Sequence, residues 1–215
     1  MNTFQYQLAL ASAAANNICT SQTPSGAGNL TLNGSLVSGG VATLDVARRV
    51  LFTPAGAEAG NSTIWTVYGT NVSGNVISEA VAGTDNPTTA TTVQDFKTVT
   101  RIAVNKAQAG AVTVGTSGVA SSPWFQFNTA TTPFNVGVAV VVSGTINYTV
   151  EYTYQDPNAL AAGTFPTLFT ISALASKTAN LDSSFTTPCW GIRLTQNSFT
   201  NPATATIYIT QAGLG

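Results

Sequence analysis

The sequence of 215 residues contains no histidine and very few charged side chains. Seven residues are Lys or Arg and eight are Asp or Glu, so 7% of the chain is charged, whereas roughly 25% is usual in globular proteins. Without histidine, His-dependent catalytic triads, histidine metal sites and imidazole pH switches are excluded. Seven scattered cations are too few for the basic surface that binds a phosphate backbone, so we expect no specific nucleic-acid partner.

Long apolar runs and a disulfide framework are also lacking. The most apolar segment, 136–142, has the length of a strand and is far too short to span a bilayer, so we expect no membrane partner. The two cysteines, Cys19 and Cys189, are far apart in the sequence. Two interpretations remain open for them: one long-range disulfide, or two small buried thiols.

Threonine takes the place of charge in this chain. It occurs 35 times, while 44% of the residues are hydrophobic and the net charge is -1. Disordered chains combine low hydrophobicity with high net charge, and this sequence does the opposite. The composition therefore predicts a folded protein with a neutral Thr, Ser, Asn and Gly surface.

Short β-branched and aromatic runs separated by Gly, Pro and Asn indicate strands and tight turns along most of the chain. The clearest hairpin joins a strand at 63–70 to a strand at 75–82 through the turn 71–74. The pair Asn33 and Gly34 predicts a second hairpin, because Asn-Gly is the strongest two-residue hairpin signal.

The C-terminal part of the sequence predicts two further strand pairs. Ser143 and Gly144 indicate a tight turn that separates a buried apolar strand from the strand that follows it. The segment 197–202 separates the last two strands, 189–196 and 204–211.

Roughly a dozen short strands with regular turn signals predict an all-β fold, an antiparallel β-sandwich or barrel. The segments 11–15 and 174–179 are helical candidates, but neither has an apolar stripe with a helical period. We therefore expect little helix.

The domain organisation is predicted from composition. A Ser- and Gly-rich stretch at 117–123 marks a boundary between a β domain at 41–118 and a second β-sandwich domain at 119–215. Residues 1–40 contain few large apolar side chains and predict an N-terminal arm, or else an ordinary first strand with a loop. The irregular stretch 156–173 is long for a hairpin loop and is a candidate interface.

The sequence offers little catalytic chemistry. The eight carboxylates are scattered, and nothing favours a glycosidase pair such as Glu79 with Glu151 over solvated or capping roles. With no histidine and two separated cysteines, we expect no metal site and no cofactor. We therefore expect the protein not to be an enzyme and to have no catalytic residues.

Two binding sites are weighed against simpler interpretations. The cations Lys97, Arg101 and Lys106 would contact phosphate if they converged, but a polar strand face explains them as well. The tryptophans Trp65, Trp124 and Trp190 would line a platform for sugars, but tryptophans in all-β chains more often pack in a core or an interface.

One group of segments resembles a known family. A strand at 66–70, a Gly-Thr-x-x-x-Gly-Asn turn and a Glu-bearing strand are followed by an Asp-Phe-x-x-Val-x-x-Ile stretch that begins at Asp95. This arrangement is similar to a module in small structural proteins of tailed bacteriophages. The resemblance extends to 45–56, 110–116 and the C-terminal segment 147–157. It implies a component of the virion and brings no catalytic residues with it.

The resemblance and the low charge together lead to a functional expectation. We expect a non-enzymatic capsid decoration or cement protein, which would be found in the virion after assembly in the bacterial cytoplasm. Its partners would be other copies of itself, a trimer among the options, and a phage capsid or head–tail protein. A head–tail connector, neck or tail accessory protein and a glycan-binding surface module are the alternatives. The candidate assembly contacts are Phe4, Tyr6, Leu8 and Leu10.

Overall fold

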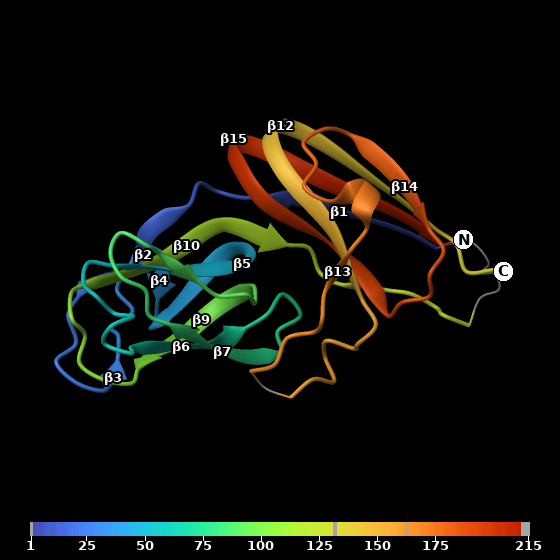
Figure 1. Ribbon diagram of the computed structural model, residues 1–215. Helices are drawn as coiled ribbons and strands as arrows, with labels where there is room; N and C mark the ends of the chain where they lie inside the picture. Colours follow the sequence, from blue (N-terminus) through green and yellow to red (C-terminus); the bar gives the residue numbers. More distant parts are fainter. Residues whose placement is uncertain (1, 131–132, 162, 212–215) are drawn as a thin grey trace. The chain divides into compact units, whose positions relative to one another are not determined.

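The computed structural model describes residues 2–130, 133–161 and 163–211, and nearly all of their regular structure is β-strand (Figure 1). The only helical element in these ranges is the 3-10 helix η1 (Ser172–Leu174). The strand pairs with a defined register are antiparallel. The prediction of an all-β antiparallel fold with little helix is therefore confirmed. No helix in the described ranges is long and apolar enough to cross a membrane.

Contacts along the chain define two compact units. The first unit consists of Met1–Ser12, Gly118–Leu160 and Phe165–Gly215, and the second consists of Ala13–Ser117 with Ala161–Thr164. The division at residue 117 lies within the compositional boundary, but it falls inside a strand, β10 (Val112–Ser121). Residues 1–12 group with the C-terminal half of the chain, and residues 13–40 group with the strands that follow them.

The second unit is built on the hydrogen-bonded strand order β10-β5-β9-β6-β7. Its strands are β2 (Ala14–Gln22), β3 (Gly28–Asn29), β4 (Val37–Ser38), β5 (Val41–Pro54), β6 (Ile64–Thr70), β7 (Val76–Ala82), β8 (Ala90–Thr91), β9 (Phe96–Val104) and the beginning of β10.

Alternation along these strands builds the core of the second unit. In β6, Trp65 and Val67 are fully buried, while Thr66 between them is more exposed. The Trp65 ring stacks on Phe52 of β5 with ring centroids 4.7 Å apart. A period of two with one apolar face is the pattern that a half-buried strand requires.

The hairpin at 63–82 is confirmed. Strands β6 and β7 pair in register from Ile64 with Ala82 to Thr70 with Val76. In the connecting turn, the side-chain oxygen of Asn71 accepts hydrogen bonds from the backbone N–H groups of Ser73 and Asn75. Side-chain bonds of this kind are the physical reason that asparagine favours turns.

The hairpin predicted at Asn33 and Gly34 is wrong. Both residues donate backbone hydrogen bonds to the carbonyl of Ile18, and a Cβ on Gly34 would lie 2.2 Å from the backbone of Asn17. The Asn-Gly pair therefore lets the chain approach β2 closely instead of reversing it. The reversal occurs later, at Gly39 and Gly40, whose positive φ angles connect β4 to β5.

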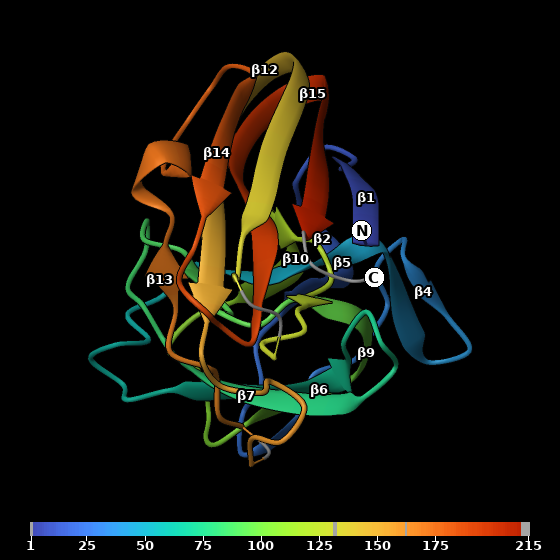
Figure 2. The ribbon, with the colours of Figure 1, turned by 90° about the vertical axis from the view of Figure 1, so that its right-hand side faces the viewer.

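The first unit is dominated by two long strands, β12 (Val136–Thr153) and β15 (Gly191–Gln211), which pair with each other over most of their length. Figure 2 shows the two strands side by side and bent in the same direction. The other strands of this unit are β1 (Asn2–Ala9), β11 (Phe125–Gln126), β13 (Phe169–Thr170), β14 (Leu181–Phe185) and the end of β10.

The long strands each belong to two groups of neighbours. The first part of β12 pairs with β14 and with the last part of β15, which in turn pairs with β1. The second part of β12 pairs with β13 and with the first part of β15, beside β10 and β11. Both parts contribute buried apolar side chains, among them Val138, Val150, Leu194 and Ile207.

The turn predicted at Ser143 and Gly144 is also wrong, as is the break predicted at 197–202. Strand pairing continues past both, because the register shifts between Ser143 and Thr145 in the manner of a β-bulge. Gly144 has a φ of 79°, and a Cβ on it would lie 2.5 Å from the carbonyl oxygen of Pro202. The glycine thus serves a bulge within a continuous pair of strands.

The two helical candidates are wrong as well. Residues 11–13 have no regular structure, and Ala14 begins β2, where it pairs with Thr116. In the segment 174–179, Lys177 makes an isolated bridge to Tyr148. Alanine has the highest helix propensity, but propensity is a weak determinant, and pairing with neighbouring strands overrides it here.

Candidate functional site

Several carboxylates accept hydrogen bonds from backbone groups of their own unit. Glu58, which is fully buried, accepts hydrogen bonds from Thr63 and from the N–H of Gly110. Asp85 accepts one from the N–H of Ala59 at 2.8 Å. No group of three Asp, Glu, Cys or His side chains that could hold a metal ion occurs among the described residues.

The two carboxylates considered as a pair from the sequence lie in different units. Glu79 lies in the second unit, where its two oxygens accept hydrogen bonds from the N–H groups of Val93 and Gln94. Glu151 lies in the first unit and accepts hydrogen bonds from Arg193 and Thr195. Both carboxylates are therefore committed to local structure.

Arg193 is enclosed in the first unit. Its side chain is 4% exposed, and its Nε donates to Glu151 at 2.8 Å. The guanidinium lies 5.0 Å from the ring centre of Trp124 and 5.2 Å from that of Phe165. Trp124 also meets Trp190 edge-on, with centroids 6.3 Å apart. Trp124 and Phe165 thus lie against the guanidinium of this ion pair, and Trp190 packs on Trp124.

The three tryptophans do not form a platform for sugars. Trp65 is fully buried in the core of the second unit, and Trp124 and Trp190 are half-buried and pack edge-on against each other in the first unit.

The three neighbouring cations do not converge either. Lys97 donates to the carbonyl oxygens of Leu44 and Asp45 at 2.7 and 2.9 Å. Arg101 lies 3.7 Å above the ring of Tyr68, and Lys106 is exposed in the loop after β9. The polar-strand interpretation fits Lys97 and Arg101, which lie on β9 and are engaged by their own unit, but not Lys106, which lies in a loop.

Of the candidate assembly residues, Phe4, Tyr6 and Leu8 lie on one face of β1, and Leu10 directly follows that strand. Leu8 is fully buried and Leu10 is 3% exposed, whereas Phe4 and Tyr6 are half-buried beside Phe125. In this chain β1 pairs with β15 of the same unit. If β1 were exchanged between copies, it would make the same contacts with β15 of the other copy, so the N-terminal arm stays a prediction.

Both cysteines are free and buried, which confirms the second of the two interpretations. Burial raises the pKa of the Cys19 thiol to about 12, and it raises the pKa of the Cys189 thiol to about 12 as well. At neutral pH both groups are therefore protonated, and the protonated thiol is a poor nucleophile.

This state of the cysteines gives a first prediction. At pH 8 the folded protein will not react with Ellman's reagent, because the raised pKa values keep both groups as thiols and burial denies the reagent access. Unfolding in guanidinium chloride will expose both cysteines, and two thiols per chain will then react, as measured by the absorbance of the reagent's product. Rapid reaction of the folded protein would contradict the buried state.

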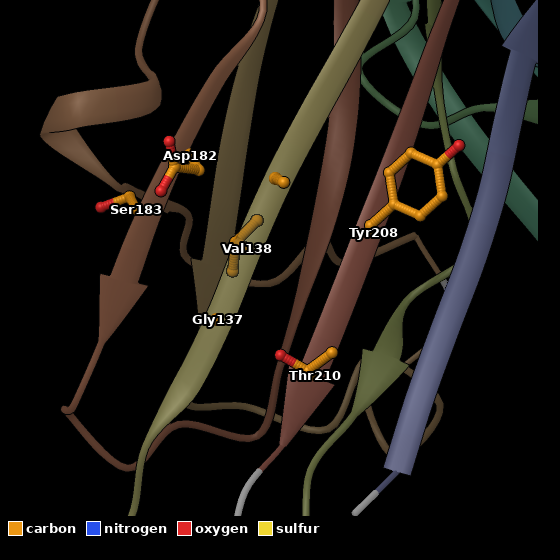
Figure 3. Close-up of a pocket in the computed structure, with 7 residues that line it drawn as sticks. Gly137, Val138, Asp182, Ser183, Tyr208 and Thr210 are labelled. Carbon is orange, nitrogen blue, oxygen red and sulfur yellow. The ribbon is translucent and has the colours of Figure 1, made fainter.

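A shallow depression lies on the outer face of the first unit, with a cavity volume of about 240 Å³ (Figure 3). We call it the β12 trough. Along β12, Val136, Val138 and Val140 point into the core, so Gly137 and Ala139 face outward and leave a low floor.

The walls of the β12 trough come from the neighbouring strands. Asp182 and Ser183 of β14 lie on one side, and Tyr208 and Thr210 of β15 lie on the other (Figure 3). Asp182, Ala139 and Tyr208 are direct cross-strand partners, and therefore form one row. The hydroxyl of Thr210 stands close over Gly137, where a Cβ would lie 2.8 Å from it.

Three polar groups of the β12 trough have no hydrogen-bond partner among the described residues. In the ranges that the structure describes, the Asp182 carboxylate makes no hydrogen bond or ion pair, and the same holds for the Tyr208 and Thr210 hydroxyls. The other acidic side chains of the first unit, Glu151 and Asp156, both accept hydrogen bonds. Among the described residues of this unit, Asp182 is therefore the acidic side chain without a partner.

Sequence reasoning missed this site. The alternation in 204–211 was the available signal, since it places Tyr208 and Thr210 on the face opposite Ile207 and Ile209. Nothing local indicates that Asp182 lies in the same row, because that row depends on β14 pairing with β12.

A second exposed cluster lies where β12 meets β13. Tyr152 and Phe169 stack with centroids 5.4 Å apart, and Tyr154 meets Phe169 edge-on at the same separation. Tyr154 is 52% exposed and Phe169 is 41% exposed.

No protein-family model matches this chain, and no curated protein matches it.

Proposed function

We propose that this protein is a non-enzymatic structural component of a tailed-phage virion that acts through protein–protein contacts. A decoration or cement role on the capsid is the form we favour. The sequence resemblance to small phage structural proteins supports the class, and the surface of the two units supports the mode of action.

One observation carries the proposal: most of the few charged side chains form hydrogen bonds or ion pairs within their own unit. Arg48 is 1% exposed and bonds the carbonyl of Ser117, Lys97 caps two carbonyls, and Glu58, Glu79 and Glu151 hold buried or backbone groups. The outward strand positions are mostly uncharged: Thr, Ser, Asn and Gln alternate there with Ala and with exposed apolar residues such as Val76 and Val141. Such a surface packs against other copies without the cost of desolvating ions.

The first unit also offers strand edges to a partner. Among the described residues, β1 pairs only with β15 and β14 pairs only with β12, so each has one edge without a strand beside it. A free edge is a template for strand addition by another chain. This supports contact with a neighbouring copy or with a capsid protein.

A head–tail connector, neck or tail accessory role is the alternative within the same class. Localisation in purified particles separates the two: cryo-electron microscopy of particles that carry this chain, with particles lacking it as the control. Density on the head shell supports decoration, and density at the neck or tail supports the alternative. Particles that contain no copy of the chain would refute the proposal.

A further inference from the structure

We propose that two copies of this protein pair through the free edge of β1, antiparallel and around a two-fold axis at Tyr6. This contact deepens the proposed assembly function and rests on it, because it specifies the partner as a second copy of the chain. β1 lies beside β15 at the end of its set of strands (Figure 2), and no described residue hydrogen-bonds to its other edge.

β1 has none of the features that protect an edge strand. Natural edge strands are kept short, or carry a charge, a proline or a bulge, which prevents pairing with another chain. β1 is eight residues long, contains no charged residue or proline, and pairs with β15 without a register shift. By contrast, β14 has five residues and carries Asp182, and β11 and β13 have two residues each. β1 therefore offers a long edge that is open to strand addition.

The hydrogen bonds of the sheet show which backbone groups of β1 face the free edge. In a strand, the backbone groups of successive residues point to opposite sides. The N–H of Val142 in β12 donates to Asn180, on the side of β14, so the alternate residues of β12 bond to β15. Followed through the register of β12, β15 and β1, this alternation turns every second residue of β1 toward β15. The other residues of β1 direct their N–H and C=O groups to the free edge: Thr3, Gln5, Gln7 and Ala9.

One register pairs all of these outward groups with those of a second copy. When Gln5 lies opposite Gln7 of the second copy, Thr3 lies opposite Ala9, and Tyr6 lies on the two-fold axis opposite its own counterpart. Every outward N–H and C=O of the strand then has a partner. Both copies use the same surface, so the contact closes as a dimer and does not grow into a filament.

The distribution of charge favours a second copy as the partner of β1. Around a two-fold axis, a charged side chain near the axis meets its own counterpart, and like charges opposite each other destabilise a sheet. The segments 1–44, 107–150 and 194–215 contain no charged side chain. They include β1 and the parts of β12 and β15 that form a sheet with it. Pairing of β14 with itself would instead bring two Asp182 carboxylates close together.

The dimer would also cover aromatic surface at this edge. Phe4 and Tyr6 lie on the inner face of β1 beside Phe125, and both remain partly exposed. Across the new edge the inward residues would form non-hydrogen-bonded pairs, in which side chains approach most closely. Tyr6 would then meet Tyr6 of the second copy, and Phe4 would meet Leu8. Aromatic and aliphatic cross-strand pairs of this kind stabilise a sheet.

The test is the mass of the purified full chain, measured by sedimentation velocity over a range of concentrations, and we expect a dimer. Gln5→Pro will weaken it about thirtyfold, because two hydrogen bonds per dimer are lost while the bonds to β15 stay in place. Ser184→Pro is the matched control, since the same alternation directs the N–H of Ser184 to the free edge of β14. This variant will leave the dimer unchanged.

A pair of charge variants tests the register. Gln5→Lys with Gln7→Lys places like charges opposite each other in the two copies and will abolish the dimer. Gln5→Lys with Gln7→Glu places opposite charges there and will restore it. Both side chains are exposed, so these changes spare the core. Each variant's unfolding midpoint is measured to establish that it is folded.

Four results would overturn the proposal. A wild-type chain that sediments as a monomer at every concentration refutes the contact, whereas the proposed function fails only if purified particles lack the chain. A dimer that Gln5→Pro leaves intact would indicate exchange of β1 or another interface. Loss of the dimer in both proline variants would indicate pairing of β1 with β14. Equal loss in both charge variants would exclude the register.

Discussion

Glu151→Gln will lower the free energy of unfolding of the first unit by about 3–5 kcal/mol, as expected when one partner of a buried ion pair is removed. The side chains of Arg193 and Glu151 are 4% and 14% exposed, and the distance from Arg193 Nε to Glu151 Oε2 is 2.8 Å. Glutamine keeps the shape but removes the charge, so a guanidinium between Trp124 and Phe165 is left without its counter-ion. Chemical denaturation followed by tryptophan fluorescence measures the change.

Two further variants distinguish the ion pair from general disturbance. Asp156→Asn changes a carboxylate that accepts one hydrogen bond, from Asn158, so its effect will stay within about 0.5 kcal/mol. The double variant Glu151→Gln with Arg193→Met will be more stable than Glu151→Gln alone, because the unpaired charge is gone. A double variant that is less stable than the single one would show that the charge pair is not the cause.

Gly144→Ala will destabilise the first unit by roughly 2–5 kcal/mol, the sum of two costs. A positive φ costs an L-residue about 1–2 kcal/mol, and forcing an atom into a packed site costs about 1–3 kcal/mol. At Gly144 both apply, since φ is 79° and the new Cβ would lie 2.5 Å from the carbonyl oxygen of Pro202. Differential scanning calorimetry measures the loss.

Gly74→Ala is the matched control for this prediction. Its φ of 81° is nearly the same, but a Cβ there would meet no atom within 4 Å. Only the conformational cost of about 1–2 kcal/mol should remain. Equal losses in the two variants would show that the approach of Pro202 to Gly144 contributes nothing.

The sequence was most informative where a strand and its partner are neighbours in the chain. The hairpin of β6 and β7 could be predicted because its turn, with Asn71 and Gly74, and both alternating strands lie within one short segment. The same kind of signal failed at Gly34 and Gly144. A glycine that permits a turn equally permits a bulge or a close approach, and the local sequence does not contain the strand that decides between them.

The candidate site shows the same division. The expectation that no carboxylate is catalytic stays a prediction; Glu58, Glu79 and Glu151 accept hydrogen bonds from neighbouring groups. The β12 trough could not be found by counting charges. Its walls, Asp182 and Tyr208, are joined only through their shared neighbour Ala139.

By itself, the sequence determined that this protein is an all-β fold with a nearly uncharged surface, because β-propensity, turn residues and composition act locally. The tertiary structure decided which turns became bulges, which charges were buried, and where a polar trough opens on β12. These depend on contacts between residues far apart in the chain, such as Arg193 with Glu151 and Asp182 with Ala139. The free energy of such a contact is gained only when both distant segments are in place, so neither segment alone specifies the contact.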